Sequence, residues 1–132
     1  MTIAYFDTIA GIAGDMSMAA LVSAGVPFDH LTAELQKLDI GGFELSAQHV
    51  QRSAIDALHI DVTVTQQPHY HRHLKDILAL VHASTLSEQV QERVTNIFTV
   101  LAHAEAKVHN TTVERIHFHE VGAIDTIVDI VG

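Results

Sequence analysis

Apolar side chains recur at every second position between residues 43 and 64. The two alternating runs contain Phe43, Leu45 and Ala47, and then Leu58, Ile60, Val62 and Val64. A period of two is typical of a half-buried β-strand. The stretch QRSAID, residues 51–56, separates the runs and is rich enough in polar residues to turn. The pattern therefore predicts an antiparallel hairpin.

Helical spacing dominates four other segments, at about residues 15–25, 27–38, 71–82 and 86–109. In the longest of them the apolar residues step by four or three, forming a narrow seam of Leu86, Val90, Val94, Ile97, Leu101, Ala104 and Val108. Such a seam packs against one partner element. Thr85 and Glu88 match the capping-box pattern that begins a helix.

The N-terminal run Ile3–Asp7 has the apolar content of a short buried strand. Residues 113–122 are expected to be a strand or extended, and residues 123–132 a helix or a strand. The predicted fold class is α+β: a small, mostly antiparallel sheet packed against about four helices, in one domain over residues 1–132. We also expect residues 116–120 to lie close to the loop that follows Asp7.

The composition excludes several classes of protein. The chain has sixteen acidic and seven basic residues, for a net charge of −9, and the basic residues are scattered singly. We therefore expect no nucleic acid partner. No apolar run approaches the roughly 20 residues of a membrane span, and the N-terminus lacks the basic region of a signal peptide. With no cysteine, a cytoplasmic protein is expected, and any metal site must use nitrogen and oxygen ligands.

Eleven histidines stand out, and two clusters concentrate them. HYHRH spans residues 69–73, and HFHE spans residues 117–120. In an extended segment, alternate imidazoles share one face, so His71 with His73, and His117 with His119, could each grip a divalent metal. The alternative for the first cluster is a solvated helix N-terminus. Because imidazole binds metal only when neutral, affinity should fall below about pH 6.5.

The stretch YFDTIAGIAGDM carries a third candidate site. A predicted strand ends at Asp7, a loop with Gly11 and Gly14 follows, and a helix begins near Asp15. Backbone N–H groups at such a junction favour a phosphate or carboxylate. The alternative is that Asp15 caps the helix while Asp7 accepts bonds from loop amides. The stretch matches neither a P-loop nor a dinucleotide-binding loop.

No catalytic residue can be assigned from the spacing. There is no thiol and no recognisable Ser-His-Asp arrangement. The histidines outside the two clusters are interpreted as structural or solvated: His30, His49, His59, His82, His103 and His109. His69 is the least secure member of its cluster, because Pro68 can turn it away.

Together, the motifs YFDTIAGIAGDM, HRHLKDI, AEAKVHN and HFHEVGAIDTIVDIVG resemble the LarC family of nickel insertion proteins. The resemblance covers essentially the whole chain in the family's order, and the last motif is long enough to be specific. It implies the N-terminal part of a protein about three times as long.

The resemblance also implies a reaction. Family members insert Ni²⁺ into a pyridinium bis-thiocarboxylate mononucleotide with consumption of CTP, forming the nickel-pincer cofactor of lactate racemase. The recipient would be lactate racemase or a related apo-enzyme. CTP, with Mg²⁺ or Mn²⁺, would bind only in a C-terminal part outside these 132 residues, so no residue here is assigned to it.

Carried onto this sequence, the family pattern gives two sets of site residues. The metal set is Asp7, His71, His73, His117, His119 and Glu120, and the loop facing the mononucleotide contributes Gly11, Gly14 and Asp15. The chain departs from the family at Ala10 and Ala13, where serine is common, and in the hairpin turn, where a glycine is usual. Neither change touches a histidine cluster.

Two other functions stay open. One is a divalent-metal store or chaperone without catalysis, and the weaker one is a phosphate-handling hydrolase that uses Asp7 and Asp15 with Mg²⁺ or Mn²⁺. Whether these 132 residues act as an enzyme alone is open as well. The apolar seam and the apolar run up to Gly132 suggest a homodimer or higher oligomer.

Overall fold

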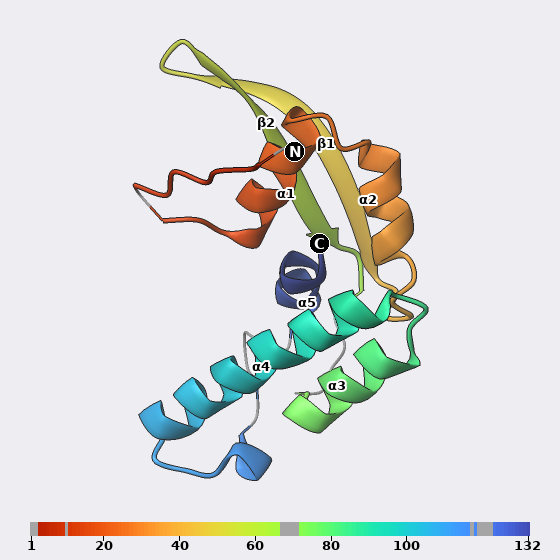
Figure 1. Ribbon diagram of the computed structural model, residues 1–132, viewed down its shortest axis with the longest axis vertical. Coiled ribbons are helices and arrows are strands. Elements are labelled where there is room, and N and C mark those ends of the chain that lie inside the picture. The colour runs from red at the N-terminus through yellow and green to blue at the C-terminus, as the bar shows by residue number, and fades with distance from the viewer. Residues whose placement is uncertain (1–2, 10, 67–71, 117, 119–122) are drawn as a thin grey trace.

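The computed structural model describes residues 3–9, 11–66, 72–116, 118 and 123–132. Within them the chain forms five α-helices, one 3₁₀ turn and a two-stranded antiparallel sheet. This arrangement confirms the α+β class. In Figure 1 the long hairpin forms one end of the molecule, α5 lies at its centre, and α4 with α3 forms the other end.

The hairpin joins β1 (Phe43–Arg52) to β2 (Ile55–Val64). Its register pairs Phe43 with Val64 and Ala47 with Ile60, so the predicted apolar positions of both strands share one face. The helices α1 and α5 both contact β2, and Ile60 is fully buried there. The period-two pattern therefore predicted both the strands and the face that they bury.

The hairpin turn is tighter than predicted and consists of Ser53 and Ala54. Both have positive φ, 50° and 64° respectively, as a type I′ turn requires. The left-handed region crowds the Cβ atom and costs a non-glycine residue about 1–2 kcal/mol. This chain therefore carries a strained turn where a glycine would relieve the strain.

Replacing Ala54 by glycine should raise the free energy of unfolding by about 1 kcal/mol, because it removes that crowding. Urea unfolding followed by circular dichroism would measure the gain. Ala57→Gly is the matched control, since glycine inside a strand should lower stability by about 0.5–1 kcal/mol. Equal effects of the two changes would contradict strain in the turn.

The four helices predicted from spacing are present with shifted ends: α1 Gly14–Ser23, α2 Phe28–Leu35, α3 Leu74–Ala83 and α4 Glu88–Val108. The segment predicted as a helix or a strand forms a fifth helix, α5 Ile124–Val131. The capping prediction for α4 is wrong by two residues. The N-cap is Ser87, whose hydroxyl accepts a hydrogen bond from Val90 N at 3.4 Å. Within the described residues, no helix is both long and apolar enough to cross a bilayer.

The strand predicted at residues 3–7 is absent. This segment is extended but unpaired, and Ile3 and Tyr5 are 75% and 86% exposed. A strand needs a neighbour for its backbone hydrogen bonds, and among the described residues β1 and β2 pair only with each other. The sheet is therefore smaller than predicted, although the five helices exceed the expected four.

The predicted apolar seam on α4 matches the buried residues only in its first half. Val94 is buried, but Ile97 is 47% and Val108 is 79% exposed. The helix instead buries Phe98, Ala102 and Ala106. A shallow apolar groove remains on its outer side, lined by Asn96, Ile97, Val100, Leu101 and Ala104. The predicted oligomer stays a prediction.

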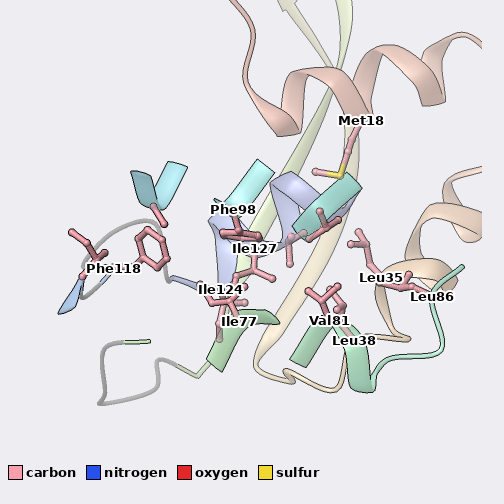
Figure 2. Packing of buried hydrophobic residues seen from close by; sticks show 14 of the residues in the cluster. Met18, Leu35, Leu38, Ile77, Val81, Leu86, Phe98, Phe118, Ile124 and Ile127 are labelled. Carbon is pink, nitrogen blue, oxygen red and sulfur yellow. The ribbon is translucent and has the colours of Figure 1, made fainter. Parts of the chain in front are cut away.

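The core lies between the helices and the inner face of the hairpin (Figure 2). Ile127 and Val128 of α5 are fully buried at its centre, and Ile77 and Val81 of α3 are buried on its far side. Phe98 and Phe118 extend this core toward the segment that carries the second histidine cluster. That extension positions the candidate site.

Candidate metal-binding site

The two histidine motifs are joined where α3 begins. Phe118 N donates a hydrogen bond to Arg72 O at 3.2 Å, and the two residues form an isolated antiparallel bridge. Arg72 belongs to the HYHRH motif and Phe118 to HFHE, although the two residues are 46 positions apart in the sequence. Both residues are buried, at 7% and 2% exposure. The described members of the two motifs therefore lie side by side.

His73 makes a second link between these segments. Its Nδ1 lies 2.9 Å from the carbonyl oxygen of Ile116. His73 is also the N-cap residue of α3, and its backbone N donates to Asp76 Oδ2 at 2.9 Å. Its position is thus set by the helix on one side and by residue 116 on the other.

Core packing holds Ile116 and Phe118 against the helices. Ile116 is 4% exposed, and the ring of Phe118 lies 6.4 Å from that of Phe98, centroid to centroid, with the planes tilted by 60°. Such tilted aromatic pairs are favourable beyond the area they bury. The strand or extended segment predicted over residues 113–122 is wrong at its start, where Val113–Arg115 form a 3₁₀ helix. Among its described residues, Ile116 and Phe118 are anchored by their buried apolar side chains.

Four of the six predicted metal residues lie outside the described part of the chain: His71, His117, His119 and Glu120. His69 lies outside it as well. Of the other two, His73 is partly buried at the junction just described, and Asp7 is exposed in the N-terminal extended segment. Within the described ranges, no three His, Asp or Glu side chains are grouped closely enough to hold one metal ion.

The loop before α1 uses its two glycines for different reasons. Gly11 has φ of +87° and donates its N–H to Thr8 O at 3.0 Å, closing a turn. Gly14 begins α1 where that helix crosses α5. A Cβ added at Gly14 would lie 2.6 Å from the carbonyl oxygen and 2.8 Å from the Cα of Asp129. Only glycine permits this close approach.

Asp15 does not cap α1. The N-cap is Ala13, and Asp15 lies inside the first turn, where its Oδ1 accepts a hydrogen bond from Met16 N at 2.8 Å. A carboxylate there is favoured by the helix dipole. Asp15 also faces the acidic residues of α5 across the Gly14 contact. Burial, and then the charges of Asp15 and Asp125, raise the pKa of Asp129 above its ordinary value of 3.8.

Asp129→Asn should therefore stabilise the fold at neutral pH. A carboxyl whose pKa is raised by folding favours the folded state when it is protonated, and this contribution is lost as pH rises through the folded-state pKa. The gain in melting temperature should be present at pH 7 and should disappear below pH 3.8, where the carboxyl is protonated in both states. Scanning calorimetry across this range would measure it.

Asp125→Asn is the control for this prediction. It removes only one of the two neighbouring charges, so its gain should be smaller, and the double variant should gain less than the sum of the two. A gain for Asp129→Asn that is the same at low and neutral pH would contradict the electrostatic explanation.

A hollow of about 520 Å³ lies elsewhere, between α1, α2 and the start of α4. Its walls are mainly apolar, including Met18, Leu31 and Leu35, with the Glu34–Lys37 ion pair on its lining. No residue of the predicted site lines it. The hollow is therefore separate from the predicted metal site.

Sequence reasoning missed two participants near these sites. Ile116 contributes a backbone carbonyl, which no side-chain pattern can indicate. Asp129 lies in the recognised stretch HFHEVGAIDTIVDIVG, but only the crossing of α1 and α5 brings it toward Asp15. The predicted proximity of residues 116–120 to the loop after Asp7 stays a prediction.

Comparison with known proteins gives a consistent family assignment. The model of a family described as nickel insertion protein matches residues 4–132. Two relatives are each named pyridinium-3,5-bisthiocarboxylic acid mononucleotide nickel insertion protein. The one from Desulfitobacterium hafniense (strain Y51) is 49% identical over 132 residues, covering 100% of this chain and 33% of its own length.

The other relative, from Geobacillus kaustophilus, is 45% identical over 141 residues, covering 100% of this chain and 34% of its own length. The chain thus spans about a third of the length of these curated relatives. No solved structure matches the chain.

Proposed function

Since the chain belongs to the nickel insertion protein family, we propose that it is the nickel-loading part of a longer protein that inserts Ni²⁺ into pyridinium-3,5-bisthiocarboxylic acid mononucleotide. Its role is to take up the ion on imidazoles and present it to the organic substrate. The observation that supports this role is the junction of the two histidine motifs at Arg72 and Phe118.

The proposed ligands are Asp7, His71, His73, His117, His119 and Glu120. Imidazole suits nickel, and carboxylate oxygen can complete the coordination. An insertion protein must bind nickel tightly enough to select it and weakly enough to release it. Nitrogen and oxygen ligands meet this requirement better than a closed thiolate cage, and the chain has no cysteine with which to build one.

Gly11, Gly14 and Asp15 are proposed to face the mononucleotide. The carboxylates of Asp15, Asp125 and Asp129 surround this end of α1 with negative charge, which opposes a bare phosphate. We therefore propose that the phosphate approaches this edge together with a divalent cation, which offsets the repulsion.

The wider activity belongs to the whole protein. It would consume CTP, with Mg²⁺ or Mn²⁺, in the part beyond these 132 residues, and the nickel-pincer product would pass to lactate racemase or a related apo-enzyme. We propose a cytoplasmic protein that assembles as a homo-oligomer through the apolar side of α4. Sedimentation at several concentrations tests the assembly, and a clean monomer throughout would exclude it.

Crystals of the chain soaked in nickel, with anomalous diffraction at the nickel edge, test the site. We expect a single strong peak beside His73. A peak that is absent there, or that lies at the Asp15 edge instead, would exclude the proposed loading site. A stronger affinity for Mg²⁺ than for Ni²⁺ would favour a hydrolase, because harder ions suit carboxylate sites.

A further inference from the structure

Exposed apolar side chains are concentrated near the N-terminus. Within the described residues, twelve large apolar side chains are exposed, and eight of them lie between residues 3 and 26. Tyr5 is 86% and Ile9 is 92% exposed. Single exposed apolar residues are normal, whereas a concentration of them marks a surface that contacts something. The N-terminal region therefore carries an interaction surface that the described part of the chain does not cover.

Residues 3–7 have the side chains of a strand without a strand's pairing. Three of the five are Ile, Tyr and Phe, which favour strands. Every residue from 3 to 9 is exposed, and among the described residues no strand pairs with this segment. In Figure 1 it forms an open red stretch that projects from the body of the molecule and leads into α1. Its backbone groups are thus available to a neighbour, as they are on an edge strand.

The next helix, α1, is an independent sign of a missing contact. Its buried residues, Met18 and Ala19, belong to the side that contacts β2 and α5. Met16, Ala20 and Leu21 are apolar as well, yet all three are exposed. A helix with apolar residues on both sides is typically covered on both. Within the described structure, α1 is covered on one side only.

The length of the relatives indicates what covers this surface. The two nickel insertion proteins compared above match the chain over 33% and 34% of their own length, so about two thirds of such a protein lies outside these residues. Gly132 lines the same hollow as Met18 and Leu21 of α1. Polypeptide attached at Gly132 would therefore start beside the exposed side of α1.

We infer that residues 3–7 pair with a strand supplied by the longer protein from beyond these 132 residues, and that the exposed side of α1 packs against the same part. This inference rests on the proposed function only in placing the chain within a longer protein. A five-residue strand makes few hydrogen bonds, and an isolated two-stranded ribbon is marginal in water. A tethered strand, by contrast, has an effective concentration in roughly the millimolar range, so it docks where a separate protein would dissociate.

Hydrogen exchange measures this pairing in the full-length protein. Amides of residues 3–7 that face the partner strand should exchange at least about 100-fold more slowly there than in the 132-residue chain, because a paired amide exchanges only when the strand opens. Residues 43–64 are the internal reference, since the hairpin is paired in both forms. Equal rates for residues 3–7 in the two forms would overturn the inference. Slow exchange that depends on the concentration of the 132-residue chain would overturn it as well, because the partner would then be a second copy.

Proline substitution tests the backbone separately from the side chains. Consecutive N–H groups of a strand point to opposite edges, so Tyr5→Pro and Phe6→Pro between them remove a bonded N–H whichever edge is paired. In the full-length protein, at least one of them should return neighbouring amides to within about tenfold of their rate in the 132-residue chain. Tyr5→Ala and Phe6→Ala lose the same side chains but keep the N–H, and should keep most of the protection.

The 132-residue chain is the second control for the proline variants. Neither proline should lower its melting temperature, because residues 3–7 are exposed and unpaired in it. Full protection in both proline variants of the full-length protein, or an equal loss in the proline and alanine variants, would exclude a paired strand.

Nickel calorimetry distinguishes failure of this inference from failure of the proposed function. Fast exchange of residues 3–7 in a full-length protein that binds nickel overturns only the docking. Protected amides in a full-length protein that binds no nickel support the docking and overturn the nickel-loading role. Protection that is lost in a proline variant and kept in its alanine counterpart supports the docked strand.

Discussion

Replacing His71 and His73 together by alanine should lower nickel affinity by at least about 100-fold, and replacing His117 and His119 together should do the same. Loss of a group that only supports a metal ligand costs about 10–100-fold, so removing two ligands should cost at least the upper end of this range. The bridge between Arg72 and Phe118 joins the two motifs, so each pair is expected to act on one site.

Calorimetry with Ni²⁺ at pH 7.5 would measure both double variants. The control is His82→Ala with His103→Ala, because both residues are exposed on helices away from the motifs. Two independent sites would show a different pattern, in which either variant keeps half of the bound nickel at unchanged affinity. That result would separate the motifs and exclude a shared site.

Elements with strong periodicity were predictable from this sequence. The hairpin followed from alternation over two runs, and even its buried face was correct, since a strand has only two faces to choose between. The helices followed from spacing, although their ends moved by several residues. Thr85 was predicted as the cap of α4, but Ser87 fills that position. Both are hydroxyl residues close to the start of the helix, so the sequence pattern alone does not choose between them.

The errors arose where tertiary partners decide the outcome. Residues 3–7 have the composition of a strand, but a strand also needs a paired neighbour, which composition does not supply. On α4, the seam of apolar residues that step by four or three suggested the buried face. The close-packed face instead uses small side chains, Ala102 and Ala106, beside Phe98, and alanine carries little hydrophobic signal of its own.

The candidate site was predictable only as a set of residue types. Histidine spacing indicated metal ligands, and the resemblance supplied nickel. The Ile116 carbonyl and the crossing that brings Asp129 toward Asp15 depend on the path of the backbone. Contacts of this kind join residues far apart in sequence, and no local pattern encodes them.

Phe118→Ala should lower the free energy of unfolding by about 3–5 kcal/mol, the usual cost of removing a buried phenylalanine side chain. Phe118 is 2% exposed and its ring contacts that of Phe98. The same change should also weaken nickel binding, because the ring anchors the segment that pairs with Arg72 and carries the second histidine motif. Chemical unfolding and nickel calorimetry, at a temperature where the variant is folded, would measure the two effects.

Phe98→Ala provides the matched control for the anchoring role. It removes the other ring of the same pair from α4, so the stability loss should be similar while nickel affinity falls much less. Should either alanine variant fail to fold, the pair Phe118→Leu and Phe98→Leu makes the same comparison with a smaller volume change. Equal losses of nickel affinity at the two positions would show that general loosening of the core, rather than the anchor at residue 118, controls the site.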